Sequence, residues 1–409
     1  MVRPERRTRG DVIAALAIAV VVALTAGVIW WTSDARATLS RPADSVSSAP
    51  PAAEAVPTGL RELWSAPSPY TTVPVIAAGT VMTGDGSTMD GRDPVTGAVR
   101  WSYTRSDREL CGVTWVYNYA VAVYPDDRGC GQVSTVDAAT GKRGPARSGV
   151  ASPHVDLSAD GTTVLSVGGS RFELWRSDMV RVIGFGEVDA RVKPVHVGTG
   201  DGCALLSAAA DDDAVSVLRF CPGETDVKLS LVRASDEDDE PEVRDVPEPG
   251  VLADSGAQVL AVSGTTTAVY LPVPEPRVSV VDDTGNEIGD YPLPEPASAA
   301  FPEGTVSKTG DLITWWTGDA VMVFSSTNIE YRYTIRRSES EVPLGPGVMM
   351  AEKLLVPVTG GIGVYDPETG APERVIPVER PPADTAVVPA VVGDILLEQR
   401  GRTLVALGQ

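Results

Sequence analysis

The sequence predicts an all-β, eight-bladed β-propeller that follows one transmembrane helix. Three observations lead to this prediction: a recurring Asp-x-x-Thr-Gly turn, a spacing of about 43 residues between its copies, and an uncharged apolar run near the N-terminus. Glycine (40 residues) and proline (33 residues) are plentiful, and no long helical pattern follows the N-terminal run. These glycines and prolines therefore indicate turns between strands.

The apolar run covers residues 12–31 and contains no charged side chain. At 1.5 Å per residue, a helix of this length spans about 30 Å, the thickness of a bilayer core. Residues 1–11 hold four arginines against Glu5 and Asp11, and the positive-inside rule therefore places this tail in the cytoplasm. The alternative is a cleaved signal peptide, with Ala35-Arg36-Ala37 as a cleavage site, although the apolar part of such a peptide is usually shorter. In both cases the rest of the chain is exported.

The next segment, residues 32–58, is rich in Pro, Ala and Ser and has few large apolar side chains. Such a composition buries too little apolar surface to fold by itself, which predicts a disordered tether. Residues 59–409 are then an extracytoplasmic propeller.

The repeated turn is the most informative motif of this domain. Its clear copies start at Asp93, Asp137 and Asp366, and a shorter copy starts at Asp282. An Asp side chain accepts hydrogen bonds from the backbone that follows it, and Gly adopts positive φ without steric cost. In the first copy a tryptophan follows the glycine by four residues, where it can pack between neighbouring sheets. The residues of this signature are Asp93, Thr96, Gly97, Trp101, Asp137, Thr140, Gly141, Asp366, Thr369 and Gly370.

This Asp-x-x-Thr-Gly-x-x-x-Trp pattern resembles the repeat of PQQ-like, or quinoprotein-type, β-propellers. The resemblance is good over residues 88–103 and partial over 131–143 and 361–376. It implies blades of four antiparallel strands. The family includes quinoprotein dehydrogenases and also a propeller lipoprotein that assists the assembly of outer-membrane proteins.

The spacing of the turns predicts the number of blades. Asp93 and Asp137 are 44 residues apart, and Asp282 and Asp366 are 84 apart, which equals two steps of 42. The interval of 145 residues between Asp137 and Asp282 becomes three steps near 43 if the acidic segment 235–249 is an insertion. Eight blades result, and seven is the second choice.

The two ends of the domain predict how the ring closes. The chain ends at residue 409 with a strand pattern that normally leads into the next Asp-x-x-Thr-Gly turn, so the last blade lacks its outer strand. The segment around Trp64 has the character of that strand and no partner nearby. We expect it to complete the last blade, because an open sheet edge invites aggregation.

The four cysteines are expected to form disulfides in an exported protein. Cys111 and Cys130 lie 19 residues apart within the second blade, and Cys203 and Cys221 lie 18 apart within the fourth. We predict these two local pairs, each linking neighbouring strands and each contributing about 3 kcal/mol in the chain-entropy model. Free buried cysteines are the alternative.

The resemblance does not extend to the quinone cofactor. Family members that bind the quinone use a disulfide of adjacent cysteines and a calcium ion with carboxylate and amide ligands. This sequence has no adjacent cysteines and three asparagines, Asn118, Asn286 and Asn328. We therefore predict no cofactor, no metal and no catalytic residue.

Other polar and aromatic groups have simpler interpretations. We interpret Asp211-Asp212-Asp213 as a hairpin turn, with a calcium site as the alternative, and His154 and His196 as ordinary core or loop residues. Trp315 and Trp316 point to opposite faces of one strand and are expected to pack between blades, with exposed contact to a ligand as the alternative.

The net charge of −21 argues against nucleic acid as a partner, because binding a phosphate backbone requires a basic face. The sequence favours a non-catalytic scaffold of the cell envelope that is held in the cytoplasmic membrane by a single pass and binds envelope proteins. The alternative is an enzyme or sensor that binds a small envelope molecule in the propeller channel, with a quinoprotein-type dehydrogenase as the least favoured case. The sequence does not identify such a ligand.

Overall fold

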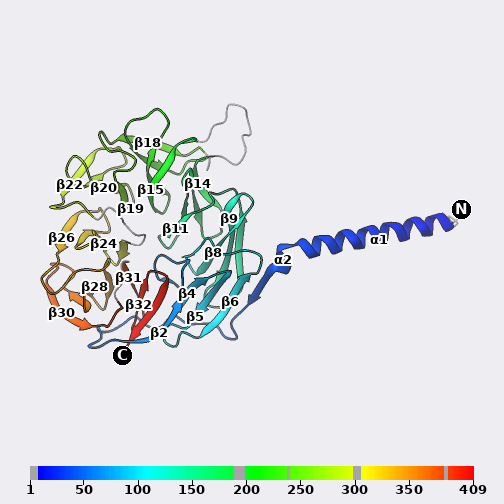
Figure 1. Ribbon diagram of the computed structural model, residues 1–409, viewed down its shortest axis with the longest axis horizontal. Coiled ribbons are helices and arrows are strands. Elements are labelled where there is room, and N and C mark those ends of the chain that lie inside the picture. The colour runs from blue at the N-terminus through cyan, green and yellow to red at the C-terminus, as the bar shows by residue number, and fades with distance from the viewer. Residues whose placement is uncertain (1–7, 188–198, 237–239, 298–304, 382–385) are drawn as a thin grey trace.

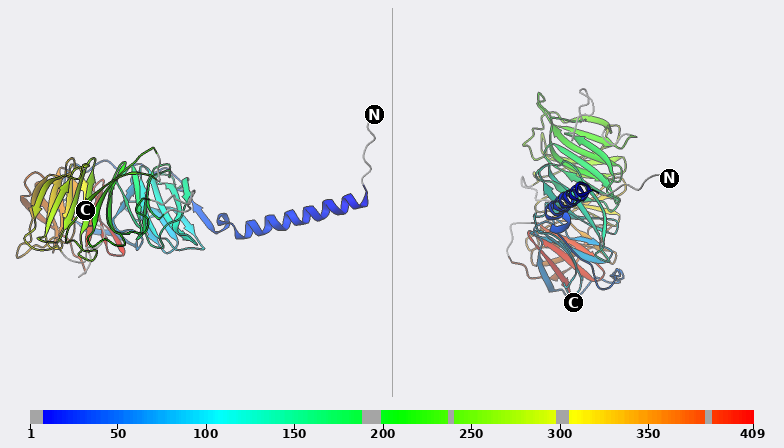
Figure 2. Two further views of the ribbon diagram at one scale, coloured as in Figure 1. Left: turned by 90° about the horizontal axis from the view of Figure 1, so that it is seen from above. Right: turned by 90° about the vertical axis from the view of Figure 1, so that its right-hand side faces the viewer.

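The computed structural model describes residues 8–187, 199–236, 240–297, 305–381 and 386–409. The described residues form eight antiparallel sheets around a central axis, and one long helix projects from the ring (Figure 1). This confirms the eight-bladed propeller and excludes the seven-bladed alternative. Seen from the side, the ring is a disc, and the helix leaves it at the perimeter (Figure 2).

The elements of the chain are two helices and 33 strands within the described residues. The helices are α1 (Arg9–Thr32) and α2 (Asp34–Ala37). The strands of blades 1 to 4 are β3 (Val75–Ala77), β4 (Thr80–Asp85), β5 (Thr88–Arg92), β6 (Val99–Arg105) and the added β1 (Thr38–Arg41); β7 (Gly112–Val116), β8 (Tyr119–Asp126), β9 (Gly129–Asp137) and β10 (Arg143–Ser148); β11 (Asp156–Ala159), β12 (Thr163–Val167), β13 (Arg171–Arg176) and β14 (Arg181–Gly186); β15 (Ala204–Asp211), β16 (Ala214–Phe220), β17 (Lys228–Arg233) and β18 (Glu242–Pro247). Those of blades 5 to 8 are β19 (Gln258–Ser263), β20 (Thr266–Leu271), β21 (Arg277–Val281) and β22 (Glu287–Pro292); β23 (Val306–Thr309), β24 (Leu312–Trp316), β25 (Val321–Ser325) and β26 (Tyr331–Ile335); β27 (Val348–Met350), β28 (Lys353–Val358), β29 (Gly361–Tyr365) and β30 (Pro372–Pro377); β31 (Val387–Val392), β32 (Ile395–Arg400), β33 (Thr403–Gly408) and β2 (Arg61–Pro67).

Each blade places its first strand at the channel and its last strand at the perimeter. The first strands of neighbouring blades contact one another, as β7 contacts β3 and β11, whereas last strands such as β10 and β22 are half exposed. The turns between first and second strands and between third and fourth strands share one rim, which we call the turn rim. The longer connections between blades lie on the opposite rim, which we call the loop rim.

Strand β2 closes the ring. It pairs antiparallel with β33, so that Trp64 lies opposite Ala406 and the N-terminal strand becomes the outer strand of blade 8. This pairing covers the edge of β33, whose unpaired backbone groups would otherwise be open to another chain. The N-terminal strand therefore has the role that the sequence predicted for it.

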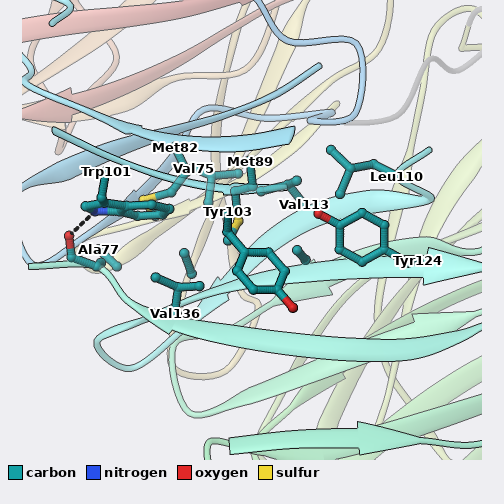
Figure 3. Close-up of a cluster of buried hydrophobic side chains, with 13 residues drawn as sticks. Val75, Ala77, Met82, Met89, Trp101, Tyr103, Leu110, Val113, Tyr124 and Val136 are labelled. Carbon is teal, nitrogen blue, oxygen red and sulfur yellow. Dashed lines mark hydrogen bonds between the residues drawn. The ribbon is translucent and has the colours of Figure 1, made fainter. Parts of the chain in front are cut away.

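The core consists of layers between adjacent sheets. Between blades 1 and 2, Trp101, Tyr103 and Tyr124 lie with Met82 and Met89 in one buried cluster (Figure 3). The indole Nε1 of Trp101 donates to the backbone oxygen of Ala138 at 2.8 Å, which satisfies the polar atom of a side chain that is 1% exposed. Similar layers lie between other pairs of neighbouring blades, for example between blades 5 and 6.

Each of the three clear signature turns is held by its aspartate and receives an aromatic residue from the preceding blade, whereas Gly285 of the shorter copy lies beside Val246 and Arg244. In blade 2, Asp137 Oδ1 accepts from the amide and the hydroxyl of Thr140 at 2.9 and 2.7 Å. Gly141 has φ of 71°, and a Cβ built on it would lie 2.5 Å from Trp101 Cβ. The glycine is therefore required both by its backbone conformation and by the side chain that packs on it.

The same contact recurs at three blade interfaces. Trp64 of blade 8 donates to the oxygen of Pro94 in the turn of blade 1 at 2.9 Å, and Tyr333 of blade 6 donates to Pro367 in the turn of blade 7 at 2.6 Å. Gly97 lies against the Trp64 ring and Gly370 against the Tyr333 ring, as Gly141 lies against Trp101. The turn of one repeat therefore contacts the preceding blade, whereas its aromatic residue contacts the following blade.

The predicted tether of residues 32–58 is wrong from residue 34 onward. Strand β1 pairs with β6 as a fifth strand of blade 1, and residues 42–58, which we call the strap, lie along the turn rim. The amide of Ser47 donates to Ala139 in blade 2, Pro50 lies beside Gly393 of blade 8, and Arg374 of blade 7 donates to Val56. A Pro- and Ala-rich chain is ordered here because the blades supply its hydrogen-bond partners and contact surface.

The acidic insertion predicted for 235–249 is also shorter than expected. Residues 242–247 form β18, the outer strand of blade 4, whose exposed Glu242, Arg244 and Asp245 alternate in part with half-buried valines. An outer strand needs to bury only one face, so a charged sequence is compatible with it. Residues 237–239 of the predicted insertion lie outside the described residues.

Candidate functional site

The junction between the helix and the propeller is short and highly connected. Helix α1 begins with a capping box of Thr8 and Asp11 and ends at Thr32. Two residues later, Asp34 Oδ1 lies 3.0 Å from Arg105 and 3.6 Å from Arg108 of blade 1. The amide of Ser106 donates to the oxygen of Ala37 at 2.8 Å, immediately before β1 begins. The apolar helix is thus joined to blade 1 without an intervening free segment.

Helix α1 is long and apolar enough to cross a membrane. A signal sequence near the N-terminus would have the same length and composition. The guanidinium of Arg36 lies 3.7 Å from the ring centroid of Trp31 at the end of the helix, which places a cation where lipid headgroups would begin.

Ser47 of the strap is buried against the propeller, with 8% of its surface exposed. Its hydroxyl contacts Arg100, which also pairs with Asp93 of the first signature turn, and accepts from Thr80 at 3.3 Å. The pKa of Asp93 is lowered, because hydrogen bonds from Thr96 and Arg100 outweigh the effect of burial, which raises it. A signature turn that the sequence assigned to blade structure therefore also holds the strap.

The channel mouth on the turn rim is bridged by polar contacts from four blades. Asp211 of blade 4 lies 2.8 Å from Lys308 of blade 6 and accepts from the amide of Gly264 in blade 5. The amide of Asp212 donates to Asp160 of blade 3 at 2.6 Å. Burial raises the pKa of Asp160, but the amides of Thr163 and Asp212 stabilise its carboxylate and lower the pKa overall. The three aspartates 211–213 form a hairpin turn, and Asp211 and Asp212 link blades.

A cavity of about 580 Å³ opens between blades 5 and 6, at the perimeter rather than in the channel. Tyr291 and Tyr331 form its aromatic wall, with ring centroids 5.5 Å apart, and Met322 adds an apolar surface. Arg336 and Arg337 are exposed at its edge. Glu295 and Asp319 also line the cavity, and Asp319 lies 3.8 Å from Arg337. The cavity therefore combines an apolar interior with an edge of mixed charge, which suits a small ligand with polar groups at one end.

The two predicted disulfides are present, Cys111–Cys130 in blade 2 and Cys203–Cys221 in blade 4. Both lie toward the loop rim. The second links the ends of the neighbouring strands β15 and β16, as expected. The first links β7 to β9, which lie on either side of β8, so it spans three strands instead of joining two neighbours.

Buried ionic clusters are the main feature that the sequence did not predict. Glu398 of blade 8 is fully buried, and Arg380, from the connection after blade 7, binds both of its oxygens at 3.0 and 2.6 Å. Arg380 also donates to the oxygens of Val358 and Gly361. In blade 3, Glu173 accepts from Trp175 at 2.8 Å and pairs with Arg147 of blade 2. These clusters join neighbouring blades.

Glu248 is a different kind of buried carboxyl group. It lies after β18, is 8% exposed, and faces Arg277 and Glu287 of blade 5. Burial raises its pKa to about 7, whereas Arg277 alone would lower it. This carboxyl group therefore titrates near neutral pH.

The other aromatic and histidine residues that the sequence singled out do not form a common site. Trp315 is fully buried, and Trp316 is half-buried and donates to the oxygen of Pro343, so both contribute to packing. His154 is exposed, whereas His196 lies outside the described residues. Within the described ranges no three His, Cys, Asp or Glu side chains group as metal ligands.

The residues present do not fit a quinone site of the kind that the family resemblance would imply. All four cysteines belong to the two disulfides, and neither disulfide joins adjacent residues. Asn118, Asn286 and Asn328 each hold a turn by bonding Asp137, Asp282 or Thr284, and Glu330.

Comparison with known proteins supports the fold and leaves the family open. No family model and no curated protein sequence matches the chain. Among solved structures, BamB from Moraxella catarrhalis is similar, with a TM-score of 0.51 and 13% identity over 86% of this chain and 100% of that one. The C-terminal WD40 domain of Sif2 gives 0.53 and 11% over 87% and 99%, and the computationally designed Ika8 protein gives 0.50 and 11% over 89% and 100%. At these identities the likeness establishes a β-propeller and nothing finer, so the PQQ-like resemblance depends on the repeat signature.

Proposed function

We propose that this chain is a single-pass protein of the cell envelope that presents a PQQ-like propeller outside the cytoplasmic membrane as a non-catalytic scaffold for protein partners. The observation that carries the proposal is the junction: Asp34 binds Arg105 and Arg108 only two residues after α1 ends, and β1 extends blade 1. A propeller that is held so close to its anchor is suited to present its rims to neighbours at a fixed place.

Two further observations support this proposal. The disulfides fit an oxidising compartment outside the cytoplasm, and the arginine-rich tail fits an N-terminus inside. BamB and the WD40 domain of Sif2 contribute an analogy of fold alone.

The test is chemical cross-linking of the full chain in its native membrane, followed by identification of the proteins attached. We expect a small, reproducible set of envelope proteins. The matched control inserts a long Gly-Ser spacer between Ser33 and Asp34, which keeps anchor and propeller but frees their relative position, and should change that set. Recovery of no specific partner would contradict the scaffold role.

The cavity between blades 5 and 6 favours a second function, a sensor for a small envelope molecule. This differs from the sequence-based alternative, which placed such a ligand in the channel. A ligand that protects the chain against thermal unfolding, with protection lost in Tyr331→Ala, would support it. An absorbance titration with the quinone and calcium tests the enzymatic alternative, and tight binding would contradict the non-catalytic proposal.

A further inference from the structure

The charge of the propeller is divided unevenly between its two sides. Residues 34–200, which include blades 1 to 3 and the outer strand of blade 8, contain 16 Lys and Arg against 18 Asp and Glu. Residues 201–409, which include the other strands of the ring, contain 14 against 35. Nearly the whole negative charge of the exported domain therefore belongs to the second group of blades.

The outer strands show the same division more sharply. Strands β1, β6, β10 and β14 of blades 1 to 3 hold six arginines and no carboxylate. The outer strands of blades 4 to 7 hold five carboxylates against three arginines: Glu242, Asp245, Glu287, Asp290 and Glu373 against Arg244, Arg332 and Arg374. The outer strand of blade 8, which belongs to the first group of residues, holds Arg61 and Glu62.

Several cations on the first side are available to a partner. Arg41 on β1, Lys142 just before β10, Arg143 at its start and Arg36 in α2 are exposed. None of them forms an ion pair with a described carboxylate. Arg41 donates to the hydroxyl of Ser102, and Arg143 lies 5.9 Å from the ring of Tyr103. Such neutral contacts leave their charges free to attract an anionic surface.

The anchor joins the ring on this same side. Figure 1 shows α1 and α2 approaching the disc beside β6 and β9, opposite β22 and β26, and Figure 2 shows the helix leaving the perimeter of the disc. Asp34, two residues after the end of the apolar helix, binds Arg105 and Arg108 of blade 1. The outer strands of this blade therefore lie close to the end of the helix.

We infer that the outer strands of blades 1 and 2 form a membrane-contacting surface for anionic lipid headgroups, so that the propeller stands edge-on to the bilayer with its acidic blades directed away. This inference rests on the proposed membrane anchoring. In this orientation both rims and the cavity between blades 5 and 6 face the aqueous compartment and remain open to partners. The acidic far side is repelled by the anionic membrane, which reinforces the same orientation.

The test uses the full chain reconstituted in vesicles of phosphatidylglycerol and phosphatidylcholine. A photo-crosslinking p-benzoylphenylalanine replaces either Ser148, exposed on β10, or Ile288, which is 56% exposed on β22. We expect lipid adducts from position 148 at roughly threefold the yield from position 288 or more, falling in vesicles of phosphatidylcholine alone and at high salt. Equal yields from both positions would overturn the inference.

Charge reversal supplies the second readout. Arg41→Glu, Lys142→Glu and Arg143→Glu combined should lower the yield at position 148, whereas Arg244→Glu, Arg336→Glu and Arg402→Glu combined, three exposed cations of the acidic side, should not. An unchanged unfolding midpoint shows that both variants fold. Equal effects of the two triple variants would contradict the surface. A chain that washes off the vesicles contradicts the anchoring itself, and so the proposed function.

Discussion

At the scale of single residues, the glycines of the signature turns are expected to be important for stability. We expect Gly141→Ala to destabilise the protein by about 2–5 kcal/mol, because the new Cβ would meet Trp101 and the residue would keep φ of 71°. Chemical denaturation measures this loss. The control is Gly169→Ala, where no atom lies within 4 Å of the new Cβ, and a loss as large there would contradict the interpretation.

The raised pKa of Glu248 predicts that stability falls as the pH rises. Its pKa is about 7 in the folded protein against 4.5 in the unfolded chain, so the folded state binds more protons between these values. Its contribution is fully present below pH 4.5 and is lost as the pH rises through 7, a fall of about 3 kcal/mol in the free energy of unfolding.

The measurement compares unfolding at about pH 5 and about pH 8, above the range in which carboxylates with lowered pKa values titrate. Glu248→Gln should remove most of the fall. Glu242→Gln, an exposed carboxylate on β18, serves as the control. An unchanged slope in the Glu248 variant would show that another group is responsible.

Residue roles were predictable where both partners lie close together in the sequence. The aspartate, threonine and glycine of each signature turn bond within five residues, and each cysteine pair lies within one blade. Tyr333, Glu248 and Glu398 acquire their roles from other blades, and no local pattern indicates a partner there. The sequence did contain one signal for Tyr333, because this tyrosine stands at the position of the signature tryptophan.

At the scale of elements, the strap distinguishes the structure from the sequence-based expectation. A free tether exchanges its amide hydrogens rapidly, whereas the amides of Ala43 and Ser47 donate to Thr140 and Ala139 of blade 2. We expect slow exchange over residues 38–47 in hydrogen–deuterium exchange mass spectrometry. Ser47→Ala, which removes the hydroxyl between Thr80 and Arg100, should raise exchange in this segment several-fold.

Ser48→Ala is the matched control, because Ser48 is the exposed neighbour of Ser47. Rapid exchange in the unsubstituted chain would favour the free tether after all. The strap and β18 were not predicted, and the physical reason is the same for both. The composition of a segment indicates only whether it can fold alone, whereas both of these segments are ordered by contacts with the rest of the ring.

At the scale of the whole molecule, we expect stability to depend on closing the ring, because β2 covers the edge of β33. Blade number and closure were predictable because repeat spacing and the missing last strand are properties of the entire chain. The place where the helix joins the ring was not predictable, since the sequence does not show that β1 joins blade 1. The polar bridge over the channel mouth likewise needs three turns and β23, from four blades, to meet.

Trp64 tests closure, because it joins the N-terminal strand of blade 8 to the turn of blade 1. Trp64→Phe keeps a ring against Gly97 and loses the bond to Pro94, so we expect a loss of about 1 kcal/mol. Trp64→Ala also loses the packing and should cost about 2–4 kcal/mol. Because β2 covers the edge of β33, the alanine variant should exchange faster in β33 and in residues 93–97 as well as in β2, and should aggregate more readily. A change confined to β2 would mean that the seven remaining blades and the three strands of blade 8 hold together without the closing strand.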